Sequence, residues 1–226
     1  MGRLATAVVI AALLAACTED PRSTTKRPTG PDAAEQVETV VVTTQDLPRG
    51  VEVELIPQGD VVEGQTTLDE CGQEFPSEAD RVARRQVTIA YPGDDGSYSH
   101  EVVAYGTNEQ ALAALHEWRA AVRSCPEDRF VAPREPGFPP VRTQLLELHA
   151  MSVLAVPDNS VARQVLTTEK GESVHVAAIY QRYGRVLSAS YLLTSGPPTR
   201  RQVDRLTEQA SSAGERLLTL PGGEPA

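Results

Sequence analysis

Three cysteines are the most reactive side chains in this chain of 226 residues. Cys17 ends an apolar run that begins at Leu4, and acidic residues follow it almost at once. A thiolate is a soft nucleophile that accepts an acyl or alkyl group, and two thiols in an oxidising compartment join as a disulfide. The surroundings of each cysteine therefore indicate which chemistry it performs.

Motifs for other chemistry are weak. The sequence STTK, Ser23 to Lys26, has the S-x-x-K spacing of penicillin-recognising enzymes, but the companion motifs S-D-N and K-T-G are missing, so we interpret the match as chance. No G-x-S-x-G elbow, P-loop or H-E-x-x-H occurs. The histidines have no second ligand at a chelating interval: His100, His116, His149 and His175. We therefore predict no catalytic residues, no metal and no cofactor.

The apolar run from Leu4 to Ala16 follows Arg3, which is the order of charge and apolar residues in a secretory signal. It is shorter than the roughly 20 apolar residues that a membrane-spanning helix needs. The end of the run, Leu14-Ala15-Ala16-Cys17, resembles the lipobox of bacterial lipoproteins. This resemblance implies that residues 1–16 are a removable signal peptide and that Cys17 is lipidated. The alternative is an ordinary signal peptide with a chance cysteine.

A lipid on Cys17 would place the chain at the cell membrane, anchored on the extracytoplasmic face through its N-terminal lipid. In that oxidising setting Cys71 and Cys125 are an even pair, so we predict one disulfide between them. Two free, buried thiols are the alternative.

Charge excludes one class of partner. The chain has 21 basic and 31 acidic residues and a formal net charge of −10. Nucleic acid is not an expected partner, because binding it requires a basic surface that neutralises phosphates.

Arg81, Arg84 and Arg85 form the most suggestive group of charges, after a predicted short helix capped by Ser77. Guanidinium groups bind carboxylates and phosphates in a planar, two-pronged geometry, so these arginines, with Tyr105, are candidate residues for a small anionic ligand. The alternative is that they offset nearby acidic residues on a solvated face: Glu74, Glu78 and Asp80.

Composition divides the chain into a lipidated N-terminus with a flexible tether (17–36), a single globular domain (37–220) and a disordered tail (221–226). Within the domain, alternating residues at 86–91 and 97–105 flank the turn signal PGDDG and predict a hairpin, and a helix begins after Thr107. The same order returns as strands at 173–183 and 185–193 and a helix after Thr199. A further strand pair is predicted at 142–148 and 160–168.

These elements predict an α+β fold. Two hairpin-helix (ββα) units would form one central antiparallel sheet, with the helices packed together on one face.

Residues 65–130 resemble a known family. Cys71 before the first strands, Val103 and Tyr105 at a strand end, the alanine-rich stretch Ala111 to Trp118, and Cys125 are similar to exported lipoproteins related to the PknH-like extracellular sensor domain. The resemblance implies an α+β domain with a central antiparallel sheet and a ligand-binding cleft outside the membrane. That sensor domain carries two disulfides, whereas this chain has one pair of cysteines available.

Three functions follow as hypotheses. The first is a membrane-anchored binding or sensor module without catalysis, with an unknown ligand. The second is a structural or interaction protein that recognises another envelope protein. The third is a hydrolase with a site assembled from distant residues. Nothing in the sequence indicates an oligomeric state.

Overall fold

The structure is a computed structural model that describes residues 31–133 and 138–221. The predicted signal peptide, the lipidation site at Cys17 and residues 222–226 of the predicted tail lie outside the described residues. The first described element, α1 (Pro31–Val40), is a helix, and its Ala33 is only 3% exposed. Helix α1 therefore begins within the residues predicted as a tether, and Ala33 packs against the domain.

Seven strands form one antiparallel sheet within the described residues, in the order β1-β2-β3-β7-β6-β5-β4. Their bounds are β1 Glu52–Leu55, β2 Arg81–Ala90, β3 Ser97–Tyr105, β4 Val141–His149, β5 Asn159–Thr168, β6 Ser173–Tyr183 and β7 Val186–Thr194. The α+β fold and the central antiparallel sheet are therefore confirmed. The hairpin β2–β3 and the pair β4–β5 form where the sequence predicts them, with β2 beginning five residues earlier than expected.

Two long helices begin at threonine caps. The side chain of Thr107 accepts a hydrogen bond from the backbone N–H of Gln110 at the start of α2 (Asn108–Ser124). Thr199 and Gln202 form a complete capping box at the start of α3 (Arg200–Leu217). Each cap satisfies backbone donors that a helix leaves unpaired at its first turn.

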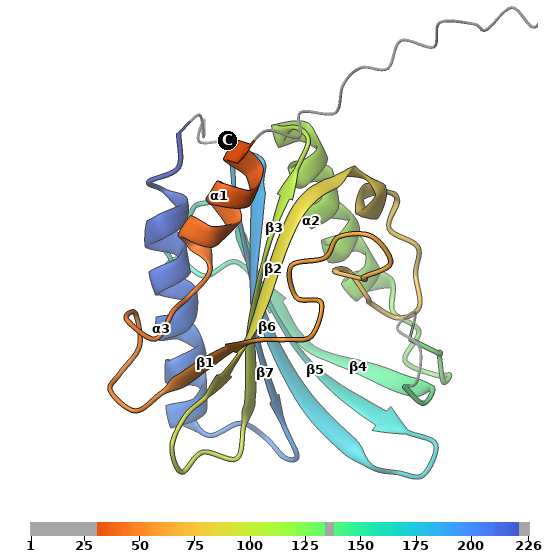
Figure 1. Ribbon diagram of the computed structural model, residues 1–226. Coiled ribbons are helices and arrows are strands. Elements are labelled where there is room, and N and C mark those ends of the chain that lie inside the picture. Colours follow the sequence, from red (N-terminus) through yellow and green to blue (C-terminus); the bar gives the residue numbers. More distant parts are fainter. Residues whose placement is uncertain (1–30, 134–137, 222–226) are drawn as a thin grey trace, which may run out of the picture.

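The helices cover both faces of the sheet, so the prediction that they share one face is wrong. Helices α1 and α3 lie on one side and α2 lies on the other (Figure 1). The reason lies in the central strands: neighbouring residues Val102 and Val103 of β3 point to opposite faces, and both are almost fully buried. Because a strand that is apolar on both faces requires cover on both sides, one layer of helices would leave half of this surface in water.

The face under α1 and α3 is a filled core. It includes His100 of β3, which accepts a hydrogen bond from the Val42 N–H at Nδ1 and contacts Ser188 Oγ through Nε2 at 2.8 Å. Burial lowers the pKa of His100 to about 3, so the ring is neutral. The distance suits a nucleophile and its base, but both side chains are 0% exposed, so no substrate reaches this pair.

None of the helices in the described part of the chain combines the length and the hydrophobicity of a membrane-spanning segment.

Candidate ligand-binding cavity

The face of the sheet under α2 is only partly covered, and a cavity of about 660 Å³ lies beside the helix. Its floor consists of side chains from β2 to β7. Its walls come from the loop between β1 and η1 (the 3₁₀ helix Pro76–Asp80), from Trp118 of α2, and from the connection between α2 and β4. We call residues 56–75, between β1 and η1, the roof loop.

Buried polar groups fix the roof loop to the sheet. The guanidinium of Arg81 donates to Thr67 Oγ1 at 2.8 Å and to the carbonyl of Gln65 at 2.5 Å. The carboxylate of Glu78 accepts from the backbone N–H groups of Thr67 and Leu68, and Thr67 Oγ1 also donates to Glu101 at 2.9 Å. The middle of the roof loop is therefore held by hydrogen bonds that involve charged groups, which are stronger than those between neutral groups.

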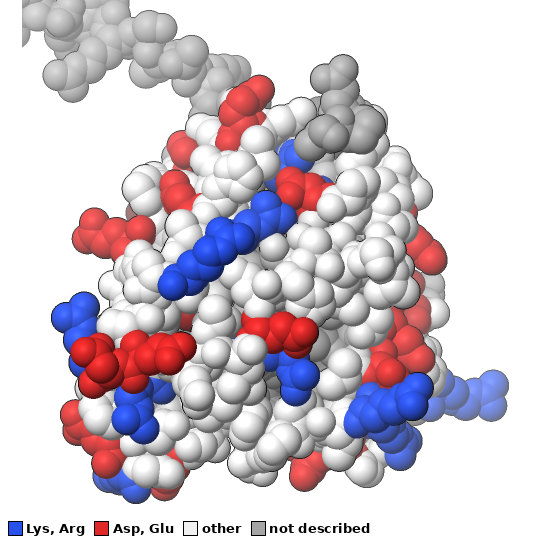
Figure 2. Space-filling model, turned by 180° about the vertical axis from the view of Figure 1, so that it is seen from behind, with Lys and Arg blue, Asp and Glu red and all other residues white. Residues whose placement is uncertain are grey.

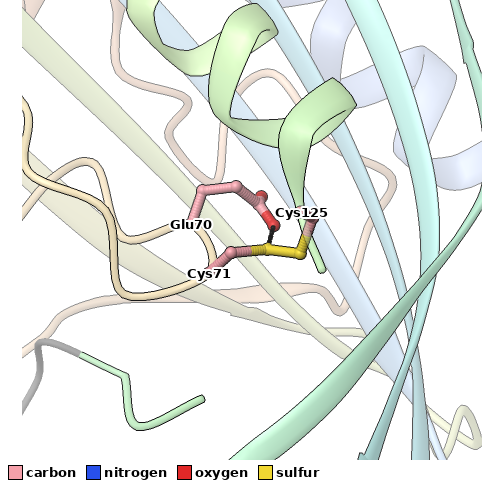
Figure 3. A group of neighbouring side chains, drawn as sticks. All are labelled: Glu70, Cys71 and Cys125. Carbon is pink, nitrogen blue, oxygen red and sulfur yellow. Dashed lines mark hydrogen bonds between the residues drawn. A yellow bond between two sulfur atoms is a disulfide. The ribbon is translucent and has the colours of Figure 1, made fainter. Parts of the chain in front are cut away.

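A disulfide fixes the other end of the roof loop. Cys71 is bonded to Cys125, directly after α2, with a Cα–Cα distance of 5.6 Å (Figure 3). Gly72 has a φ of +64°, and a Cβ there would lie 2.7 Å from the carbonyl oxygen of Ala132. This position therefore requires glycine, since any side chain would collide with the connection from α2 to β4. The predicted disulfide is present, and it closes one end of the cavity.

Glu70 faces the cavity next to this disulfide. Its Oε1 accepts a hydrogen bond from Gln164 Nε2 of β5 at 2.8 Å. The same oxygen lies 3.1 Å from Cys71 Sγ (Figure 3). Burial raises the pKa of Glu70 to about 7, although the Gln164 hydrogen bond opposes the shift. A disulfide sulfur carries no hydrogen, so a hydrogen bond to it requires the protonated form of Glu70 as the donor.

The group Glu70, Cys71 and Cys125 also has the spacing of a metal site, with ligand atoms within 4.8 Å of one another. Metal coordination by cysteine uses the thiolate, and both sulfurs here are bonded to each other. The oxidised site therefore does not offer the two anionic sulfur ligands that zinc prefers.

An ion pair lies at the floor of the cavity. Arg84 of β2 donates from Nε to Glu101 of β3 at 2.5 Å, and both side chains are 3% exposed. Arg84 also donates to the carbonyl of Gln58 and to the side chain of Gln86. Burial raises the pKa of Glu101, and the neighbouring Arg84 opposes that shift. The charge of Arg84 is thus already matched within the protein.

The predicted ligand residues do not form one site. Arg81 is committed to the roof loop and to Glu78 at 3.2 Å, and Arg84 alone of the three arginines lines the cavity. Arg85 lies on the opposite face and pairs with Glu38 of α1, because adjacent residues of a strand alternate between faces. Tyr105 is fully buried beneath α2 and does not line the cavity. The short helix before them starts after Phe75, without a side-chain cap from Ser77.

Sequence reasoning missed most of the roof-loop residues that line the cavity. The roof loop has no periodicity, and Glu70 gives no signal beyond its place next to Cys71. The aromatic wall comes from Trp118, Tyr180 and Tyr191, which lie on three different elements. Trp118 appears in the sequence as one residue of a buried helical stripe. Its position at the edge of the cavity depends on how α2 packs on the sheet, which the sequence alone does not indicate.

Charges on the rear surface are mixed. Figure 2 shows basic and acidic side chains interspersed among uncharged ones, without a continuous basic area among the described residues of that face. This mixture accords with the formal net charge of −10.

Comparison with solved structures identifies a similar fold. The extracellular domain of PknH from Mycobacterium tuberculosis aligns with a TM-score of 0.55 over 83% of this chain and 99% of that domain, at 12% sequence identity. The two folds are similar. An uncharacterised protein (Rv0999 ortholog) from Mycobacterium smegmatis aligns with a TM-score of 0.42 at 11% identity, over 83% of this chain and 98% of that chain. No protein-family model and no curated protein sequence matches the chain.

Proposed function

We propose that this protein is a non-catalytic binding or sensor module of the cell envelope that takes a small molecule into the cavity under the roof loop. The observation that carries the proposal is the cavity of about 660 Å³, which has the size of a small-molecule site. Its walls combine apolar side chains with a few polar groups, as ligand sites do. The similarity of the fold to an extracellular domain supports the same interpretation.

Filling the cavity tests this proposal. Val176 of β6 lines the cavity, whereas Val174, two residues earlier on the same face of the strand, is exposed and does not line it. We expect the uncharged probe N-phenyl-1-naphthylamine to fluoresce with the wild-type protein and with the control V174W. With V176W the signal should fall by about tenfold or more, because the indole occupies the apolar volume. Equal signals from V176W and V174W would contradict binding in this cavity.

We also propose that the module is anchored through Cys17 to the extracytoplasmic face of the membrane. The lipobox-like sequence Leu14 to Cys17 supports this, and the disulfide between Cys71 and Cys125 suits an oxidising compartment.

Metabolic labelling tests the anchor. In a bacterial host, wild-type protein should incorporate labelled palmitate and sediment with membranes. The variant C17A should lose the label and most of its membrane association, because no thiol remains to accept the lipid. C71S/C125S should keep the label. Labelling of C17A at the wild-type level would show that the lipid is attached elsewhere.

A further inference from the structure

Glu70 is a buried acidic group of the cavity that has no cation as a partner among the described residues. The residue is 8% exposed, and its hydrogen-bond donor is the neutral amide of Gln164. Among the described residues Glu70 forms no ion pair, and both contacts found for its carboxyl group involve Oε1. Burying a carboxylate without a cation carries a desolvation penalty in free energy, and a bound cation would offset part of that penalty.

The other charged residues that line the cavity are consistent with a positively charged ligand. Three of the described lining residues are acidic, namely Asp69, Glu70 and Glu101, and one is basic, Arg84. Because Arg84 is paired with Glu101 at 2.5 Å, its charge does not compensate Glu70. Among the described residues, an anionic ligand would therefore meet the Glu70 carboxylate without a neighbouring cation to offset it, and a cationic ligand would pair with that carboxylate.

The remaining surface of the cavity is aromatic and aliphatic. The rings of Trp118 and Tyr180 have centroids 3.9 Å apart, and Tyr191 meets Tyr180 edge-on at 5.8 Å. Aromatic faces attract ammonium groups and also contact alkyl chains. Aliphatic side chains complete the walls: Ile56, Val141, Leu166, Val176 and Leu193.

We propose that the cavity binds a molecule in which a protonated amine is attached to an apolar body, with the amine paired to the Glu70 carboxylate and the apolar body against the aromatic and aliphatic walls. This inference rests on the proposed function and names the chemical class of its ligand. It replaces the anionic ligand expected from the arginine-rich sequence.

Three ligands of equal chain length test the proposal with the purified full-length protein. Octylammonium, 1-octanol and octanoate differ in charge and share the apolar body. In titration calorimetry at pH 8, octylammonium should bind about tenfold or more tightly than octanol, since a hydrogen bond to a charged partner is stronger than one between neutral groups. Octanoate should bind most weakly.

The variant E70Q identifies the group responsible. It should bind octanol as the wild type does and lose the preference for octylammonium. The control E169Q removes an exposed carboxylate outside the cavity and should behave as the wild type, so a general effect of net charge is separated from a local one.

A change of pH makes the same test without a substitution. Ionised Glu70 predominates at pH 8, and the protonated form predominates at pH 5, because its pKa is raised to about 7. Among the described residues, the charged groups that line the cavity with Glu70 are Asp69 on its own loop and the Arg84–Glu101 pair from β2 and β3. Strand β5 contributes the neutral Gln164, β6 contributes Tyr180, and the disulfide follows α2. Wild-type protein at pH 5 should therefore lose its preference for octylammonium over octanol.

The outcomes separate the two proposals. Equal affinity of the wild type for octylammonium and octanol at pH 8 would overturn the amine inference while leaving binding in the cavity intact. A preference for octylammonium that survives in E70Q would place the cation site elsewhere and would also overturn it. Failure of both octanol and N-phenyl-1-naphthylamine to bind would contradict the proposed function itself.

Discussion

Removing the disulfide with the double variant C71S/C125S should lower the free energy of unfolding by about 4 kcal/mol. The two cysteines are 54 residues apart, so the bond closes a long loop and reduces the conformational entropy of the unfolded chain. Urea denaturation at pH 7, followed by circular dichroism, measures the change. The loss is large compared with the 5–15 kcal/mol by which domains are typically stable.

Reduction provides the control for this prediction. A reducing agent should destabilise the wild type to the level of C71S/C125S and leave the double variant unchanged. A loss below about 1 kcal/mol in the double variant would mean that the disulfide contributes little to the free energy of unfolding. A reductant effect that persists in the double variant would have another cause.

Breaking the buried ion pair should destabilise the protein by a similar amount. The variant R84M leaves the Glu101 carboxylate in a site that is 3% exposed, and an unpaired buried charge typically costs about 3–5 kcal/mol. The loss should be smaller at pH 5 than at pH 8. The carboxyl of Glu101, whose pKa burial already raises, can take up a proton in the folded state at pH 5, whereas at pH 8 it must either stay charged or hold that proton at a cost.

A neighbouring pair on the same strand is the matched control. Arg85 pairs with Glu38 on the other face, where the side chains are 29% and 52% exposed. Such a pair contributes about 0–1 kcal/mol, so R85M should have a small effect. The double variant R84M/E101M should recover part of the stability lost in R84M, because no charge is then stranded. Equal losses of unfolding free energy in R84M and R85M would show that the buried ion pair contributes no more to stability than the exposed one.

The elements that were predictable are those whose signal is local. Turn residues between alternating strands located the hairpin β2–β3, and the Thr107 cap located the start of α2. The same applies to β4 and β5, which form at 141–149 and 159–168 against the predicted 142–148 and 160–168.

Features that depend on long-range packing were not predictable in the same way. The face of the sheet on which each helix packs depends on both faces of β3 being apolar and on which other elements already cover each face. The polar residues around Ala33 in the sequence predict a tether, yet its side chain packs on the domain. A six-residue extension of α1 carries too little periodicity to be distinguished from a polar linker.

The arginines illustrate the limit at the site. Arg81, Arg84 and Arg85 are close in sequence, and proximity suggested a common ligand. In the structure they pair with three different carboxylates, because strand residues alternate between faces and each guanidinium meets a different acceptor: Glu78, Glu101 and Glu38. Glu70 gives no signal in the sequence, because its role depends on the absence of a neighbouring cation among the described residues of the folded structure.

The roof loop is fixed by the disulfide at Cys71 and by the hydrogen bonds at Thr67, so its shape exists before a ligand arrives. A preformed site loses little conformational freedom on binding, and more of the contact energy then appears as affinity. Association should accordingly occur in one step, with a rate that rises linearly with ligand concentration and without a slow closing phase. Reduction of the disulfide would release one end of the roof, and weaker binding through faster dissociation should follow.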